Sequence, residues 1–169
     1  MEEKVTYGYV ERTHGLKGRL ILKLFVLGPA AALDEGSVLY IGEKPFTVNR
    51  SRKKDNERIT VDCEGVYTRE QGEALRGSTV TAELSTVLRD DLPLPVHGFR
   101  GFTILSNGKR FAVEEVQYNS TNPQLLVRGE AGVFPVPLNM ALTGEVDPGE
   151  RTIAVDLPSG MDADSGAPC

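Results

Sequence analysis

The chain has 169 residues, of which 40% are hydrophobic and 25% are charged. Both fractions are near those of ordinary globular proteins, so they exclude a disordered, collagen-like or coiled-coil chain, and the length allows one medium domain or two small ones. The formal net charge of −5 is unevenly spread: residues 1–88 contain 13 Lys and Arg against 13 Asp and Glu, whereas residues 89–169 contain 6 against 11.

The first half of the sequence consists of short runs rich in Val, Ile, Leu, Thr and Tyr, separated by turn residues, which is typical of antiparallel strands. Gly42-Glu43 predicts a tight hairpin between two of these runs, and residues 51–56 predict the next one. The six strands expected here span residues 5–11, 19–26, 37–41, 45–50, 57–63 and 78–84.

One helix is expected within this half, over residues 68–77. Thr68 and Gln71 have the spacing of a capping box, and Gly77 provides the left-handed residue that commonly ends a helix. We expect Ala74 and Leu75 to face the strands, so that the helix closes one end of a barrel.

The second half begins after residues 89–96, which contain two prolines and two acids and therefore suit neither a helix nor a central strand. Asn107-Gly108 is a strong hairpin signal beyond this boundary. Five strands are expected, at 101–105, 110–118, 124–128, 132–136 and 151–156, and because open sheet edges are a liability they suggest a nearly closed barrel. The predicted domains are therefore residues 1–88 and 97–162, with a linker at 89–96 and a flexible tail at 163–169.

No segment predicts a membrane helix or a secretory signal. The longest uncharged apolar stretch, residues 24–33, is interrupted by Gly-Pro and is shorter than the roughly 20 residues that a span needs. The first five residues lack the basic start and apolar core of a signal peptide, so a cytoplasmic location is expected.

The sequence offers little for catalysis or metal binding. Its two Cys and two His residues, at positions 14, 63, 97 and 169, lack the spacing of metal ligands. Neither histidine lies in a nucleophile motif, and Cys63, on a predicted strand, is expected to be a small buried hydrophobic residue. We therefore expect a protein that is not an enzyme and that uses no cofactor or metal.

Two groups of cations in the first half are candidates for binding a polyanion. The first lies in a stretch without acids between Glu11 and Asp34, and the second lies at residues 50–54. The turn at residues 14–18, with two glycines, suits a tight loop that presents an apolar side chain and a cation. An ordinary solvated surface is the alternative for both groups. The predicted ribosome- or RNA-binding residues are Arg12, His14, Gly15, Leu16, Lys17, Gly18, Arg19, Arg50, Arg52, Lys53 and Lys54.

Four motifs in order make the sequence similar to the RimM family of ribosome maturation factors, over about residues 5–162. Residues 8–19, with Gly8-Tyr9-Val10 and His14-Gly15-Leu16-Lys17-Gly18-Arg19, resemble the N-terminal signature of the family. Residues 69–77 resemble its helix that ends in Ala-Leu-Arg-Gly. Residues 134–137 resemble its strand with alternating prolines, and residues 149–161 resemble its closing strand.

This resemblance implies an all-β fold with one short helix and two β-barrel domains, first a six-stranded barrel like those of translation factors and then a PRC-barrel. It implies a non-enzymatic accessory factor for late assembly of the head of the small (30S) ribosomal subunit and for processing of 16S rRNA. The implied partners are the free small subunit, the head ribosomal protein uS19 and 16S rRNA. The protein is expected to act as a monomer and not to bind a membrane. A general RNA-binding β-barrel protein and a small-molecule enzyme on a split barrel are the alternatives.

The sequence departs from the family at the entry to the second domain. There the family usually carries a Tyr-Tyr pair, whereas this chain has Leu94-Pro95. Tyrosines are typical interface anchors, so Phe99 and Arg100 are expected to take their place, the alternative being a core Phe beside a solvated Arg. The predicted protein-binding residues are Leu94, Pro95, His97, Phe99 and Arg100.

Overall fold

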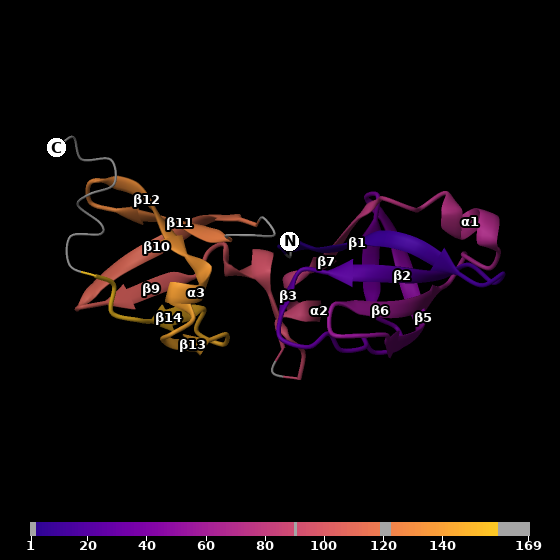
Figure 1. Cartoon of the computed structure of the whole chain (residues 1–169), viewed down its shortest axis with the longest axis horizontal. Coiled ribbons are helices and arrows are strands. Elements are labelled where there is room, and N and C mark those ends of the chain that lie inside the picture. The colour runs from indigo at the N-terminus through magenta and orange to yellow at the C-terminus, as the bar shows by residue number, and fades with distance from the viewer. Residues whose placement is uncertain (1–2, 90, 119–122, 159–169) are drawn as a thin grey trace. The chain divides into compact units, whose positions relative to one another are not determined.

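The computed structural model describes residues 3–89, 91–118 and 123–158 (Figure 1). The chain forms two compact units, Met1–Gly98 and Phe99–Cys169. The predicted linker at 89–96 falls within the first unit, and the predicted tail at 163–169 lies outside the described residues. The expected all-β fold is confirmed, with a closed six-stranded barrel in the first half and a second six-stranded sheet in the other, and with three short helices in the described residues where one was expected.

A closed barrel of antiparallel strands, in the order β1-β2-β6-β5-β4-β7, forms most of the first unit. The six strands expected in the first half are the six strands of this barrel, with ends shifted by a few residues. Their bounds are β1 Lys4–His14, β2 Arg19–Leu24, β4 Val38–Ile41, β5 Lys44–Lys53, β6 Arg58–Cys63 and β7 Thr79–Glu83.

Period-two alternation builds the core of the barrel. In β6, Ile59, Val61 and Cys63 are buried, whereas the intervening polar residues are partly exposed. Cys63 is thus a buried hydrophobic residue as expected, and burial raises the pKa of its thiol to about 12. The inward residues of the other strands pack on these side chains, so the interior of the barrel is a hydrophobic core.

Register shifts interrupt this alternation twice in β1, between Thr6 and Gly8 and between Val10 and Arg12, and once in β5. In β1, Val10 pairs with Leu22 but Arg12 pairs with Ile21, so Glu11 is the extra residue. In β5 the same shift occurs between Val48 and Arg50. Because a bulge sets two residues opposite one, the side chains that follow it change face.

The predicted hairpin turns are confirmed by their backbone angles. Gly42 and Glu43 have φ of 57° and 75°, and Asn107 and Gly108 have φ of 49° and 80°. Two successive positive φ values define the type I′ turn, whose twist matches that of the flanking strands. The Asn and Gly residues therefore set the register of two strand pairs.

The helix α1 forms over Arg69–Glu73 and is shorter than predicted. Its capping box is present as expected: the Thr68 hydroxyl accepts the backbone N–H of Gln71, whose side-chain oxygen accepts the N–H of Thr68, both at 3.1 Å. Leu75 packs on the barrel core, but Ala74 is exposed, contrary to the expectation that both would face the strands. The chain turns after the helix, and Gly77 adopts a φ of 82°.

Several short elements of the first unit were not predicted. Strands β3, Val26–Leu27, and β8, Leu94–Pro95, pair with each other outside the barrel. Helix α2, Leu84–Val87, and the 3-10 helix Val96–Phe99, whose last residue belongs to the second unit, are single turns. Elements this short carry too little pattern for sequence periodicity to find.

The second unit contains a six-stranded sheet in the order β12-β11-β10-β9-β14-β13. All pairs are antiparallel except β14 with β9, which is parallel. The five expected strands are present, and β13 and the single-turn helix α3 were missed. The bounds are β9 Thr103–Ser106, β10 Lys109–Gln117, β11 Gln124–Gly129, β12 Gly132–Pro137, α3 Leu138–Ala141, β13 Glu145–Asp147 and β14 Thr152–Ala154.

Two structural features are relevant to function at this level. In the described part of the chain, no helix is long and apolar enough to span a membrane. Within the same residues, no three or more His, Cys, Asp or Glu side chains are grouped so as to hold a metal ion.

Candidate nucleic-acid interface

The barrel register brings cations of both basic groups of the sequence onto one surface. On the outward side of the strands, Arg50 of β5 lies opposite Asp62 of β6, Asp62 pairs with Arg19 of β2, and Arg19 lies opposite His14 of β1. Residues directly opposite each other in a sheet have their Cβ atoms about 5 Å apart, so this row crosses four strands without a gap.

The adjacent rows continue the same surface. Arg52 lies opposite Thr60, and at the other edge Arg12 lies opposite Ile21. The third row contains Lys23 opposite Arg58. We call this surface the outer face; its basic residues are Arg12, His14, Arg19, Lys23, Arg50, Arg52 and Arg58.

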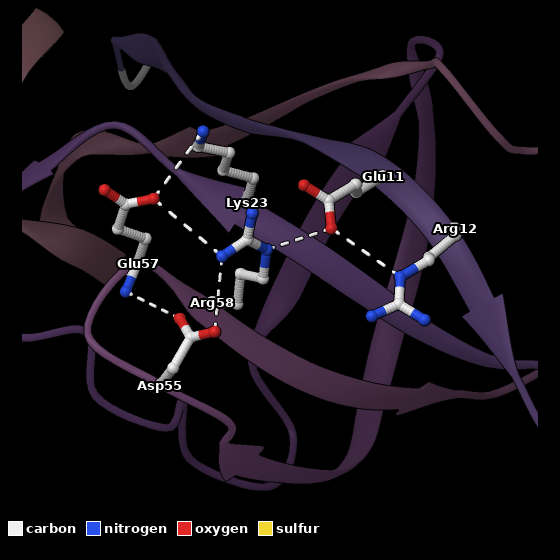
Figure 2. A network of polar contacts seen from close by, with 6 residues as sticks. All are labelled: Glu11, Arg12, Lys23, Asp55, Glu57 and Arg58. Carbon is white, nitrogen blue, oxygen red and sulfur yellow. Dashed lines mark hydrogen bonds and ion pairs between the residues drawn. The ribbon is translucent and has the colours of Figure 1, made fainter.

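Arg58 is at the centre of an ion-pair network on this face (Figure 2). Its Nε donates to Glu11 Oε1 at 2.9 Å, and its Nη1 donates to Asp55 Oδ2 at 3.2 Å. The hydrogen bond from Arg58 holds the pKa of Glu11 below its ordinary value and raises the pKa of Arg58 itself. The pKa of Asp55 is lowered mainly by the backbone N–H of Glu57 and further by Arg58. These three side chains therefore hold one another in their charged forms.

Two further cations join the network at longer range. Lys23 Nζ lies 3.6 Å from Glu57 Oε2, and Arg12 Nε lies 3.7 Å from Glu11 Oε1 (Figure 2). The Arg12 and Glu57 side chains are more exposed than Arg58 and Glu11, so water screens these contacts more strongly. The six side chains in the network together carry three positive and three negative charges.

Arg19 forms a separate ion pair with Asp62 across β2 and β6. Its Nε and Nη2 donate to the two carboxylate oxygens at 2.9 and 3.3 Å, which is the bidentate geometry that Arg forms with carboxylates. The hydrogen bond to Asp62 raises the pKa of Arg19. Its guanidinium is therefore already partnered within the barrel.

The cations of the second basic group are in a different state. Arg50, Arg52, Lys53 and Lys54 are exposed, and no carboxylate in the described part of the chain pairs with them. Lys53 lies opposite the buried Ile59, so the register places it at the rim rather than on the outer face, and Lys54 follows the end of β5. Arg50 and Arg52 thus provide the unneutralised charge of this surface.

The loop between β1 and β2, residues 15–18, is held in place by the segment that begins α1. The backbone N–H of Arg69 donates to the carbonyl of Leu16 at 3.0 Å, and the Thr13 hydroxyl donates to Glu73 at 2.6 Å. Gly18 has a φ of 77°, and a Cβ there would lie 2.6 Å from the carbonyl oxygen of Thr68. The close approach therefore requires glycine at 18, and the loop presents Leu16 and Lys17 to solvent.

The residues predicted to bind a protein partner are divided between the two units. Leu94 is half-buried and Pro95 is buried in the short β3–β8 pair, and His97 packs edge-on against Phe25 with ring centroids 5.7 Å apart. Burial lowers the pKa of His97.

In the second unit, Phe99 is buried and packs edge-on on Phe102, with ring centroids 5.1 Å apart, whereas Arg100 is exposed. The sequence allowed two interpretations of these residues, interface anchors or a core Phe beside a solvated Arg, and the structure has the second arrangement. In this structure the Phe99 ring has no surface to offer a partner.

Arg58, Glu11 and Asp62 were not among the predicted site residues. The signal that could have found Arg58 and Asp62 is their alternation with Ile59, Val61 and Cys63, because side chains two apart on a strand share a face. Glu11 could not be placed this way, since its orientation depends on the bulge in β1.

The comparisons with known proteins agree with the motifs of the sequence. The family model of the RimM N-terminal domain matches residues 5–87. The ribosome maturation factor RimM of Acidothermus cellulolyticus is 26% identical over 164 residues, covering 94% of this chain and 93% of that protein. The RimM of Salinispora arenicola is 25% identical over 174 residues, covering 91% and 96%.

Two solved structures are also similar. A RimM from Pseudomonas aeruginosa, described as a 16S ribosomal RNA processing protein, has a TM-score of 0.38 at 16% identity and covers 93% of this chain and 99% of that one. The solution structure of the N-terminal domain of RimM from Thermus thermophilus has a TM-score of 0.40 at 22% identity and covers 50% of this chain and 93% of that one.

The fold and the site thus define a protein of two β units, the first a closed six-stranded barrel with a basic outer face. The barrel coincides with the matched domain, and the curated relatives align with nearly the whole chain. The first unit matches the RimM N-terminal domain, and the resemblance of the chain to RimM found in the sequence is confirmed.

Proposed function

We propose that this protein is a non-enzymatic factor for assembly of the small ribosomal subunit and for processing of 16S rRNA, which binds the free subunit through the outer face of its first unit. The match of the first unit to the RimM N-terminal domain, and the alignment of nearly the whole chain with ribosome maturation factors, support the general role in ribosome maturation. The observation that carries the RNA-binding part is the register that joins both basic groups into one face across β1, β2, β6 and β5.

Charge supports this assignment of RNA to the first unit. Arg50 and Arg52 project from neighbouring outward positions of β5, exposed and without carboxylate partners in the described chain. Cations that are not neutralised internally can replace the counterions of a nucleic-acid backbone, and this release of ions drives binding. Lys17, at the end of the same face, adds a further exposed cation. Its loop is held by the hydrogen bond from the backbone N–H of Arg69 to the carbonyl of Leu16.

We assign the second unit to a basic protein partner, by family resemblance uS19 of the subunit head. Residues 89–169 have 11 acids against 6 bases, and a surface of that sign attracts a basic protein electrostatically. Among the described residues of the second unit, the exposed acids without a cationic partner are Glu115, Glu130, Glu145, Asp147, Glu150 and Asp156. Arg100 is the exposed member of the predicted protein-binding set, and Leu94 and His97 are half-buried. A monomer acting in the cytoplasm is part of this proposal.

The test is sedimentation of a cell extract on a density gradient at low and high salt. The protein should travel with free small subunits or their precursors and not with joined ribosomes, and the association should weaken as salt rises. Sedimentation with joined ribosomes, or with no particle, would contradict the proposal. Binding to RNA of every kind without preference for the subunit would favour the general RNA-binding alternative.

A point variant sharpens this test. Lys17→Ala removes a free cation from an exposed loop, so it should reduce association with the subunit while leaving the thermal midpoint almost unchanged. Arg110→Ala, which removes an exposed cation of β10 in the second unit, is the matched control and should retain association. Equal association of both variants and the parent protein would remove the loop from the binding site.

A further inference from the structure

The tip of the first unit combines two unusually exposed apolar side chains. Leu16 is 79% exposed and Tyr67 is 60% exposed; of the residues that the structure describes, only Tyr118 in the second unit joins them as an exposed large hydrophobic residue. Leu16 and Tyr67 lie 51 positions apart in sequence, yet the Leu16 carbonyl accepts the backbone N–H of Arg69, two residues after Tyr67. Figure 1 shows α1 beside the ends of β1 and β2.

The exposure of Tyr67 follows from the way α1 is packed. Tyr67 immediately precedes the N-cap Thr68, a position whose apolar side chain usually packs on the fourth residue of the helix. That residue is Gly72, and a Cβ there would lie 2.6 Å from Thr13 Cγ2. The close contact between the helix and β1 thus requires glycine, and glycine leaves the Tyr67 ring without its usual intrahelical contact.

Hydrogen bonds and close backbone contacts hold this tip although its side chains are exposed. The N–H of Tyr67 donates to Gln71 Oε1 at 2.7 Å, and Gly18 is buried against the backbone of Thr68. An aromatic ring on a fixed backbone loses little conformational entropy when it binds a partner. The fold therefore holds the Tyr67 ring at the surface, where it does not contribute to the hydrophobic core.

The chemistry around the ring fits an unpaired nucleobase. Lys17 and Arg69 are exposed at the tip and have no carboxylate partner in the described chain, and they can reach phosphates on either side of a base. The exposed Glu70 offsets one of these charges, so binding here depends on contact area more than on net charge. Aromatic rings stack on bases of any sequence, and bases available for stacking belong to single-stranded segments.

We propose that Tyr67, with Leu16 beside it, forms a stacking site for an unpaired base of RNA at the tip of the barrel. This inference rests on the proposed RNA binding of the outer face, because the row that ends at His14 and Arg19 leads to the same loop. The outer face would bind the phosphates of the RNA, and the tip would select a single-stranded segment over a duplex.

The chain contains no tryptophan, so one substitution provides a specific reporter. In Tyr67→Trp the single indole should be quenched on addition of a short single-stranded oligoribonucleotide. An abasic oligonucleotide with the same number of phosphates should leave the emission unchanged. Tyr118→Trp, with its indole at the other exposed tyrosine, is the matched control and should not be quenched by either probe.

Affinity measurements separate stacking from charge. Tyr67→Ala should bind the single-stranded probe roughly tenfold more weakly, with an unchanged dependence of log affinity on log salt, whereas Tyr67→Phe should bind like the parent. The thermal midpoints of all variants should match, since the Thr68–Gln71 capping box does not use the ring.

The possible outcomes distinguish a failure of the stacking site from a failure of the proposed function. Binding of the probe by the parent protein, combined with unquenched Tyr67→Trp and full affinity of Tyr67→Ala, overturns the stacking site and leaves the proposed function standing. No binding of RNA by the parent overturns both. If Tyr67→Ala weakens binding of a ribosomal protein and not of RNA, the tip is a protein contact and the stacking site is wrong.

Discussion

The β5 side of the outer face and the side centred on β6 both carry cations, but the electrostatic states of these cations differ. On β5, Arg50 and Arg52 are exposed and unpaired within the described chain. Around β6, Arg58 is bound by two carboxylates, and Lys23 contacts a third (Figure 2). The cations of the first region can exchange their small counterions for RNA phosphates. The cations of the second region are already paired with carboxylates of the same barrel.

This difference shows why a count of basic residues in the sequence overstates the charge available for binding. Of the first basic group, Arg12 and Arg19 have carboxylate neighbours, and Arg19 is held bidentate. We therefore infer that the β5 cations dominate RNA affinity and that the β6 network mainly stabilises the barrel.

The largest expected effect is on RNA affinity, from a triple substitution on the β5 side. Arg50→Ala with Arg52→Ala and Lys54→Ala should weaken binding of single-stranded RNA by more than tenfold at low salt. The slope of log affinity against log salt should become shallower by about 0.7 for each RNA phosphate that the variant no longer neutralises. Fluorescence anisotropy over a salt series measures both quantities.

The matched control is the triple substitution Lys109→Ala, Arg110→Ala and Arg128→Ala in the second unit, which changes the net charge equally. It should leave most of the affinity and slope intact. Equal losses in the two triple variants would show that net charge, and not the outer face, governs binding.

The family resemblance implied the six-stranded barrel, and the residue pattern alone was sufficient to predict its six strands. It was not sufficient to predict the outer face. Without the bulge between Val48 and Arg50, strict alternation from Val48 would turn Arg50 and Arg52 toward the core. The bulge gives these residues outward positions, and no residue type in this stretch of the sequence marks it.

The protein-binding segment shows a second limit of sequence reasoning. Phe99 was expected as a possible anchor because it stands near the position of the family's tyrosines, but its burial is decided by Phe102, three residues later. A single aromatic residue in a short segment has no periodicity from which burial could be inferred. The capping box of α1, in contrast, is a local hydrogen-bond pattern, and it was predicted correctly.

The β6 network predicts a pH-dependent effect on stability. Arg58→Gln removes the guanidinium that Glu11 and Asp55 share, so the thermal midpoint at neutral pH should fall by a few degrees. The folded-state pKa of Glu11 lies below its ordinary value of about 4.5, so the contribution is present above that value and is lost as the pH falls through the folded pKa. The melting curves of parent and variant should therefore converge in acid.

The control for this measurement is Arg52→Gln, which removes an exposed cation without a carboxylate partner in the described chain. Its midpoint should stay close to that of the parent at every pH. A constant difference between Arg58→Gln and the parent from neutral pH into acid would show that Arg58 stabilises the barrel by packing of its side chain and not by charge.

The smallest expected effect is a gain of RNA affinity when the network is loosened without being broken. Glu57→Gln removes the carboxylate that lies 3.6 Å from Lys23 and 3.8 Å from Arg58, while the hydrogen bonds of Arg58 to Glu11 and Asp55 are retained. The backbone N–H of Glu57 still donates to Asp55, so the turn keeps its geometry. Lys23 then becomes available to a phosphate, and affinity should rise about twofold with a slightly steeper salt slope. Glu130→Gln makes the same change in net charge in the second unit and should raise affinity less. Equal gains of RNA affinity in the two variants would show that Lys23 does not become available on the outer face. The ion pairs of the network would then affect the stability of the barrel and not RNA binding.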